Sequence, residues 1–255
     1  MQISYAMIIV KFGGSVICNK EKPFSFNEKI VEMLVDEIVQ FYPEEKFIVV
    51  HGGGSFGHPL AKKYEIRKGI NEKNIIGVCE THQAMLELNK KIVQKFLEKN
   101  LPAFPVSPSS IFIIEKGSIV DGWIKSIEEM LNRNFIPILF GDVAIAKDKG
   151  IDILSGDQII TYLANKLNAD KVIFLMDVDG IYDRNPKEKE AKLIEKINEK
   201  MKIKWEKKKF DVTGGIKNKI EEAFKMPCKV YFINGMKKGN LTKAIKGEKV
   251  GTVKV

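Results

Sequence analysis

A glycine-rich segment that directly follows an apolar run is the feature that most constrains this chain. Residues 47–50 read Phe-Ile-Val-Val, and residues 51–58 continue as His-Gly-Gly-Gly-Ser-Phe-Gly-His. The apolar run is typical of a buried strand, and consecutive glycines let backbone N–H groups converge where side chains would intrude. A helix after the loop would add its positive end at the same place. The segment therefore predicts an anion-binding loop closed by His58, whose ring can titrate near neutral pH.

Two other segments repeat this design. Residues 7–15 run from an apolar stretch through Lys11 into a Gly-Gly-Ser loop. Residues 211–219 place Gly-Gly before a stretch of helical periodicity that carries two lysines. Glycine loops with lysines nearby suit phosphate groups, and their recurrence suggests that two phosphates are held. Three aspartates also end or follow apolar runs, and we expect them at the same edge of a sheet: Asp157, Asp177 and Asp179.

Apolar runs and helical periodicity alternate from residue 8 to about residue 185. This alternation predicts an α/β fold, with an open, mostly parallel sheet covered by helices on both faces. The expected strands are 7–11, 46–50, 103–106, 136–140, 171–175 and 229–233. The expected helices are 27–41, 78–99, 125–133, 157–168 and 216–225. Residues 142–153 are expected to form a hairpin, and the lysine- and glutamate-rich residues 186–210 a solvated helix and loop.

The net charge of +9 raises the question of a nucleic-acid partner. The excess comes mostly from lysine, whereas arginine is the usual residue for forked contacts to bases and phosphates. We therefore expect no nucleic-acid partner and a solvated lysine surface that attracts anionic substrates. No apolar run approaches the roughly 20 residues that span a bilayer, so we expect no membrane partner. The 3 cysteines are widely spaced without a metal-binding pattern, which fits a reducing cytoplasm.

Five motifs carry a resemblance to a known family. In chain order they are VKFGGS (10–15), HGGGSFGH (51–58), SGDQI (155–159), LMDVDGIY (175–182) and DVTGGIKNK (211–219). With these motifs the chain resembles the amino acid kinase family, and within it the members that phosphorylate isopentenyl phosphate to isopentenyl diphosphate. The resemblance implies ATP as the phosphoryl donor, Mg²⁺ that arrives with ATP, and a homodimer. It also implies a single domain with an acceptor lobe (about 1–155) and a nucleotide lobe (about 156–255).

Phosphoryl transfer and the resemblance together predict the site residues. In-line transfer needs positioning and fixed positive charge, so Lys11, at the end of a strand, is the expected contact of the transferred group. The resemblance assigns Lys20 to transition-state stabilisation and Asp157 to holding the lysines, although Asp157 also suits a helix N-cap. Resemblance to the members that act on isopentenyl phosphate favours Lys217 as the ATP contact, whereas the catalytic lysine of the wider family falls nearer Lys219; both are kept, with Lys217 preferred. The predicted catalytic residues are Lys11, Lys20, His58, Asp157 and Lys217; the predicted nucleotide-binding residues are Lys11, Gly13, Gly14, Ser15, Gly54, Asp177, Gly180, Gly215, Lys217 and Lys219; and the predicted acceptor-binding residues are Gly53, Gly54, Gly57, His58 and Gly156.

The nature of the acceptor gives His58 its role. An alcohol acceptor would call for a carboxylate base, whereas a phosphate monoester has a second pKa of about 6 and needs none. What a phosphate acceptor needs is a group that holds and neutralises it, and His58 with the amides of the glycine loop would do so. No dedicated metal cage is visible in the sequence, so Mg²⁺ is expected on the phosphates of ATP and no protein metal site is predicted.

Apolar residues near the predicted site admit two interpretations. The helix 78–99 carries more of them than one face requires, and they suit either an isopentenyl-sized pocket or, more commonly, the core. These residues are Val78, Cys79, Met85, Leu86 and Leu88, with Val143 and Ile153 as further pocket candidates. His51 and His82 are expected in structural roles.

Other functions leave more of the sequence unexplained. Gly52, Gly54 and Gly57 satisfy the GxGxxG of an NAD-dependent oxidoreductase, but residues 66–78 do not form the next strand that this fold needs. A Walker P-loop is absent from the sequence. A nucleotide sensor without turnover is disfavoured because the lysines and Asp157 are all retained. Within the family, acetylglutamate, glutamate, carbamate and uridylate kinases stay open, and uridylate kinase is the nearest rival because its acceptor is also a monophosphate.

Overall fold

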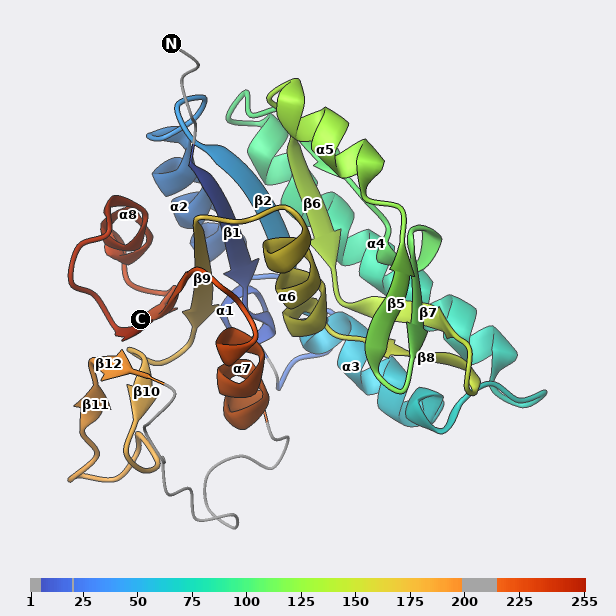
Figure 1. Cartoon of the computed structure of the whole chain (residues 1–255). Helices are drawn as coiled ribbons and strands as arrows, with labels where there is room; N and C mark the ends of the chain where they lie inside the picture. The colour runs from blue at the N-terminus through green and yellow to red at the C-terminus, as the bar shows by residue number, and fades with distance from the viewer. Residues whose placement is uncertain (1–5, 20, 199–214) are drawn as a thin grey trace.

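A large twisted sheet forms the centre of the molecule. The computed structural model describes residues 6–19, 21–198 and 215–255, and in this part of the chain the sheet has eight strands (Figure 1). In spatial order they are β12 (Lys196–Ile197), β14 (Thr252–Lys254), β13 (Lys229–Asn234), β9 (Lys171–Met176), β1 (Met7–Phe12), β2 (Lys46–His51), β6 (Ile136–Phe140) and β3 (Ala103–Pro105). The strands from β13 to β3 are parallel, while β14 and β12 run in the opposite direction.

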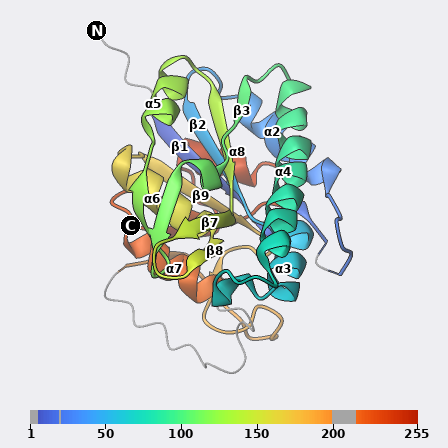
Figure 2. The same ribbon diagram turned by 90° about the vertical axis from the view of Figure 1, so that its right-hand side faces the viewer.

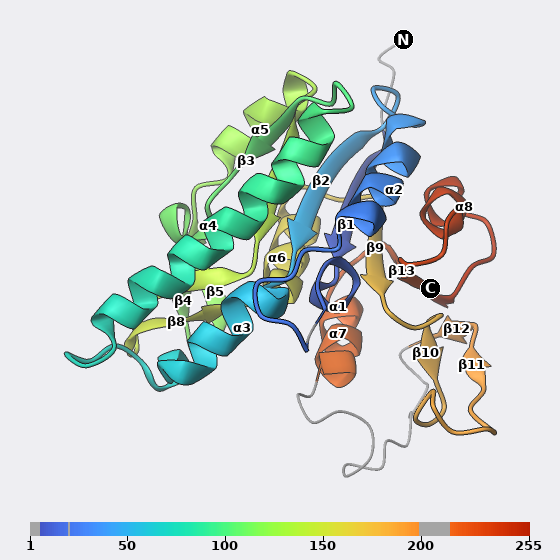
Figure 3. The same ribbon diagram turned by 180° about the vertical axis from the view of Figure 1, so that it is seen from behind.

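Helices cover both faces of this sheet. One face carries α1 (Gly14–Ile17), α2 (Glu28–Val39), α3 (Gly54–Lys63), α4 (Ile75–Leu97) and α8 (Asn240–Lys246) (Figure 3). The other carries α5 (Lys125–Asn132), α6 (Gly156–Lys166) and α7 (Gly215–Phe224). Alternation along β1 explains the two layers, because Ile8 and Val10 enter the first core while Ile9 enters the second. None of the described helices is long and apolar enough to cross a membrane.

Two smaller sheets and two 3₁₀ turns complete the fold. A four-stranded sheet contains β5 (Ser118–Gly122), β4 (Phe112–Glu115), β7 (Asp142–Ala146) and β8 (Gly150–Leu154), in that spatial order (Figure 2). A two-stranded ribbon pairs β10 (Ile181–Tyr182) with β11 (Leu193–Ile194), and short 3₁₀ turns cover Ile66–Lys68 and Pro108–Ser110. The smaller sheet brings the ends of β7 and β8 close to α3 and α4, where the acceptor side of the site is expected.

The α/β fold with its mostly parallel, doubly covered sheet is confirmed, and the six expected strands and five expected helices are all present with small shifts at their ends. The hairpin over 142–153 is confirmed as β7 and β8. The expectation of a solvated helix in 186–210 is wrong for its described part, because residues 193–197 form β11 and β12, and β12 joins the large sheet. Residues 199–210 lie outside the described residues.

Helix α3 is an element that the sequence did not predict. Its sequence, GSFGHPLAKK, contains two glycines and Pro59, and these residues are more typical of a loop than of a helix. Pro59 cannot donate to the carbonyl of Ser55 one turn earlier, and the N–H of Phe24 donates to that carbonyl instead, at 3.2 Å. Ser25 N donates to Ser55 Oγ at 3.0 Å, and the rings of Phe24 and Phe56 meet edge to face at 5.3 Å. Tertiary contacts therefore hold a helix that its own sequence disfavours.

A buried carboxylate joins the helices α2 and α8. Glu37, only 2% exposed, accepts hydrogen bonds from Gly239 N at 2.9 Å and from Thr242 N at 2.7 Å. The hydroxyl of Thr242 donates to it as well, at 2.9 Å. These amides belong to the start of α8, where N–H groups have no partner within the helix. Glu37 thus supplies the cap that the sequence of α8 lacks.

We expect Glu37→Gln to lower the free energy of unfolding by about 1–3 kcal/mol, because an amide NH₂ would face backbone donors that now meet an oxygen. The measurement is urea unfolding, followed by circular dichroism. Asp36→Asn is the matched control, since Asp36 is 53% exposed and its ion pair with Lys99 lies at the surface. Equal losses in the two variants would contradict the capping role of Glu37.

Candidate active site

Two of the glycine loops meet backbone to backbone. A β-carbon at Gly14 would lie 2.8 Å from Gly54 N, and one at Gly52 would lie 3.1 Å from Gly14 N. Such distances leave no room for a side chain, so the glycines permit the close approach of β1 and β2 where both strands end. The starts of α1 and α3 therefore lie together at the carboxyl edge of the sheet, with backbone N–H groups of their first turns unpaired within the helices.

An ion-paired triad lies beside these loops. Asp157 Oδ1 is 2.9 Å from Lys11 Nζ, and Asp157 Oδ2 is 3.2 Å from Lys219 Nζ. The side chains of Lys11 and Asp157 are only 7% and 12% exposed. Burial lowers the pKa of Lys11, an effect that Asp157 opposes and Lys219 reinforces. Burial by itself would raise the pKa of Asp157, but the two lysines outweigh it and hold that pKa below its ordinary value.

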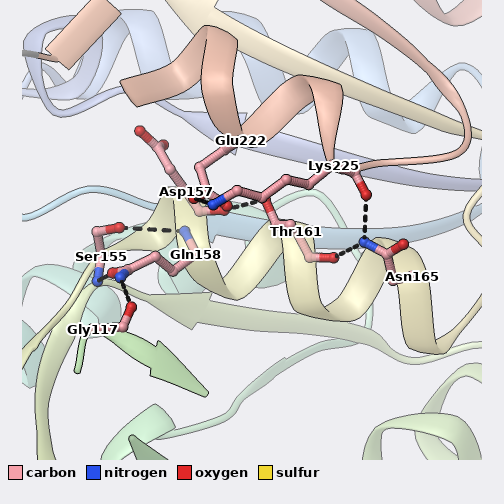
Figure 4. Close-up of polar contacts among 8 residues, drawn as sticks. All are labelled: Gly117, Ser155, Asp157, Gln158, Thr161, Asn165, Glu222 and Lys225. Atoms are coloured by element: carbon pink, nitrogen blue, oxygen red, sulfur yellow. Dashed lines mark hydrogen bonds and ion pairs between the residues drawn. The ribbon is translucent and has the colours of Figure 1, made fainter. Parts of the chain in front are cut away.

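Helix α6 places Asp157 through contacts at both of its ends (Figure 4). Ser155 is the N-cap, and with Gln158 it forms a capping box, so the alternative role of Asp157 as the cap is excluded. The side-chain Nε2 of Gln158 also donates to the carbonyl of Gly117, in the turn between β4 and β5. At the other end, Asn165 Nδ2 donates to the carbonyl of Lys225, just after α7, at 3.1 Å. This last bond fixes α7, and with it Lys219, against α6.

The structure separates the two lysines of α7. Lys219 contacts Asp157, whereas Lys217 is 63% exposed and lies 3.6 Å from Glu221 on the outer side of the helix. The two lysines face different directions, as residues two apart on a helix do, and the role of Lys217 as a contact of ATP stays a prediction. Gly215 begins α7, and Lys20 lies outside the described residues.

The acceptor side is built on the first turns of α3. Gly53 is the N-cap of this helix, and His58 lies in its second turn with an exposed side chain. A β-carbon at Gly53 would lie 3.4 Å from the His58 ring and 3.5 Å from Met85 Sδ, and one at Gly57 would lie 2.5 Å from the same sulfur. The glycines thus let Met85 of α4 pack beside His58. Met85 itself is 1% exposed and belongs to the core.

Gly156 lets the start of α6 lie against the ends of β1 and β2. A β-carbon there would lie 3.2 Å from Lys11 Cε and 3.3 Å from the carbonyl of His51. Helix α6 therefore begins in direct contact with the Lys11 side chain. The start of α6 adds a third helix N-terminus to the group formed by α1 and α3, a combination that favours anionic ligands.

Residues at the ends of β9 and β13 form the remaining edge. Asp177 is exposed just after β9, as a nucleotide contact would require. Gly180 is buried, and a β-carbon added there would lie 2.6 Å from Thr252 Oγ1. Asp179, expected at the same edge of the sheet, accepts from Lys237 at 2.6 Å and from Asn234 at 3.0 Å. Lys237 and Asn234 both hold the pKa of Asp179 below its ordinary value. Sequence reasoning missed this contact, although Asn-Gly after the strand β13 was a signal for it.

Two other histidines lie near the site without joining the triad. His51 is buried at the end of β2 and stacks on Phe140, with a ring separation of 5.4 Å. His82, on α4, lies with Nδ1 2.8 Å from Asp142 Oδ2. The hydrogen bond to Asp142 raises the pKa of His82, and burial raises the pKa of Asp142. Both histidines have defined structural partners.

Comparison with known proteins was made on the whole chain. The family model described as "Amino acid kinase family" matches residues 6–231. An isopentenyl phosphate kinase of Methanocaldococcus jannaschii is 37% identical, over 96% of this chain and 97% of that protein. One of Methanothermobacter thermautotrophicus is 34% identical, over 96% and 97%. A solved structure of an isopentenyl phosphate kinase superposes with a TM-score of 0.85 at 32% identity, covering 98% of this chain and 100% of the other.

The raised pKa of His82 gives a pH-dependent contribution to stability. Because the folded pKa lies above the unfolded value of about 6.5, the contribution is complete below that value and is lost as the pH rises through the folded pKa. His82→Asn is the comparison, since an asparagine amide can replace Nδ1 but cannot ionise. We expect the excess unfolding free energy of the wild type over His82→Asn to shrink between about pH 6 and pH 9 in urea titrations. A constant or growing difference would exclude an ionised His82.

Proposed function

The chain belongs to the amino acid kinase family, and from this membership we propose that it transfers the γ-phosphoryl group of ATP to isopentenyl phosphate. An oxygen of the acceptor phosphate forms the new bond to phosphorus, the bond to the bridging oxygen of ADP breaks, and the product is isopentenyl diphosphate. The observation that carries this proposal is the match, along nearly the full length of both chains, to relatives that are isopentenyl phosphate kinases.

The state of Asp157 supports an acceptor that arrives already ionised. A kinase of an alcohol needs a carboxylate that accepts the hydroxyl proton. Asp157 is paired with Lys11 and Lys219, which hold its pKa low, so it is a poor proton acceptor at neutral pH. A phosphate monoester, with a second pKa of about 6, is largely a dianion at neutral pH and needs no base.

Different residues would bind the acceptor phosphate and the transferred phosphoryl group. We propose that the acceptor phosphate binds at the start of α3, where the backbone amides of Gly53 and Gly54 and the ring of His58 would hold it. The side chains of Lys11 and Lys219 would neutralise the charge that spreads over the transferred group. Lys20 and Lys217 remain predictions, the first as a transition-state contact and the second as a contact of ATP.

The nucleotide would lie along the starts of α1 and α7 and the ends of β9 and β13. The contact predictions for Gly13, Gly14, Ser15, Asp177, Gly180 and Gly215 belong to this region. Mg²⁺, when bound with ATP, would supply positive charge that stabilises the phosphates. Among the described residues there is no group of three or more His, Cys, Asp or Glu side chains that could hold a metal ion.

The organisation of the protein completes the proposal. We assign acceptor binding to residues of about 1–155 and nucleotide binding to those of about 156–255, with the large sheet continuous across both. A homodimer in the cytoplasm is proposed from the family resemblance. The reaction class places this protein after a step that yields an isoprenoid monophosphate.

An acceptor panel tests the proposed function. We expect ADP release with isopentenyl phosphate to exceed that with uridine monophosphate, acetylglutamate or carbamate. His58→Ala should lower kcat/KM for isopentenyl phosphate by about 10²–10³, because a hydrogen-bond donor to the acceptor is lost. Lys62→Ala, four residues along α3 and exposed, is the control and should change kcat/KM less than threefold. Preference for another acceptor would overturn the assigned substrate while leaving the family intact.

The two lysines of α7 offer a second test. Lys219→Met should lower kcat by about 10²–10³, since it removes a charge that Asp157 aims at the transferred group. Lys217→Met makes the same chemical change on the same helix, at an exposed position. We expect its kcat to stay within a few-fold of the wild type. A larger loss in Lys217→Met would restore the interpretation that the sequence favoured.

A further inference from the structure

A chain of hydrogen bonds runs from helix α4 to the base of the second glycine loop. Asn89 Nδ2 lies 3.1 Å from His51 Nε2 and 3.4 Å from the carbonyl oxygen of Ile138. On the other side of the imidazole, His51 Nδ1 lies 3.1 Å from the carbonyl oxygen of Gly52. Asn89 and His51 are 2% and 0% exposed, so each polar atom must find its partner within the protein.

Chemistry fixes the direction of every bond in this chain. The carbonyl of Ile138 can only accept, so the atom of Asn89 that faces it is the NH₂ nitrogen. The same nitrogen faces His51 Nε2, which must therefore be unprotonated and accept. A neutral imidazole with a bare Nε2 carries its proton on Nδ1. His51 Nδ1 is then the donor to the carbonyl of Gly52.

The surroundings of His51 exclude the charged form. The pKa of His51 is lowered to about 4, chiefly by burial and also by the nearby ammonium of Lys11, against the opposing effect of the Gly52 carbonyl. The ring also stacks on Phe140 rather than on a carboxylate. His51 is thus a neutral hydrogen-bonding group at neutral pH.

The bond to Gly52 controls the next amide. Because a trans peptide is planar, its C=O and N–H point in opposite directions. Holding the Gly52 carbonyl toward the buried ring therefore turns the N–H of Gly53 away from it. Gly53 is the N-cap of α3, at the place where the acceptor phosphate is proposed to bind.

We propose that His51 is a positioning residue for the acceptor: its Nδ1–H holds the Gly52 carbonyl and so sets the Gly53 amide toward the acceptor phosphate, while Asn89 selects the tautomer. The part that concerns the acceptor rests on the proposed function. The tautomer and the orientation of the peptide do not.

The tautomer is tested directly in the wild-type protein. The chain has 3 histidines, and labelling them with ¹⁵N gives spectra in which proton couplings to the two ring nitrogens distinguish the tautomers. We expect one ring, that of His51, to stay neutral and Nδ1-protonated between about pH 8 and pH 5.5. An Nε2-protonated or charged ring at that position would overturn the proposal, whatever substrate the enzyme uses.

Two variants test the consequence for the acceptor. In His51→Asn the amide nitrogen can take the place of Nδ1 and keep the bond to Gly52. In His51→Gln the longer side chain can reach Asn89 but leaves the Gly52 carbonyl without its donor. Both variants remove the imidazole ring that stacks on Phe140, so both lose the same packing contact. We expect His51→Gln to raise KM for isopentenyl phosphate at least tenfold with KM for ATP within about twofold, and His51→Asn to stay within about threefold of the wild type in both.

Equal effects of the two variants, or a parallel rise of KM for ATP, would reduce His51 to a packing residue. If the wild type turns over a different acceptor, the proposed substrate fails, and the same comparison made with that acceptor still decides the role of His51. If both variants fail to fold, the spectrum of the wild type still confirms or refutes the tautomer on which the role depends.

Discussion

The ion-paired triad of Lys11, Asp157 and Lys219 is the interaction on which the site depends. It joins strand β1 to the helices α6 and α7, which come from distant parts of the sequence. Two ammonium groups this close would repel each other, and removing one partner of a buried pair typically costs about 3–5 kcal/mol. Asp157 makes the assembly stable by pairing with both lysines, and the triad keeps a net positive charge. A phosphoryl group that enters with negative charge then meets two cations that need no reorganisation.

The glycines around the triad explain why this arrangement can be so compact. Gly14, Gly52 and Gly156 each stand where a β-carbon would approach the backbone or the Lys11 side chain to within about 3 Å. Their absence of side chains lets three helices begin around one buried lysine. The outer contacts, such as the bond between Asn165 and Lys225, then hold the second lobe in register with the first.

Local sequence patterns predicted the sheet and the glycine loops because strand periodicity and loop chemistry act over a few residues. They did not predict α3, since its glycines and Pro59 disfavour a helix, and contacts with Phe24 and Ser25 from another segment stabilise it. The choice between Lys217 and Lys219 also lay beyond local patterns. It depends on how α7 is rotated against α6, and the bond from Asn165 fixes that rotation only in the folded chain. The contact roles of Lys20, Lys217 and the loop glycines remain predictions.

The carbonyl of Ser55, which Pro59 leaves without its helical donor, has a thermodynamic consequence. It accepts from Phe24, so residues 21–25, directly after Lys20 in the chain, are bonded to the helix that carries His58. Because these bonds form only when both segments hold these positions, a ligand that stabilises the start of α3 also favours this position of Phe24 and Ser25. Linkage requires the reverse as well, so a ligand that orders residues 21–25 strengthens binding at α3 by the same factor. A proline that weakens a helix locally thereby couples the two sides of the site.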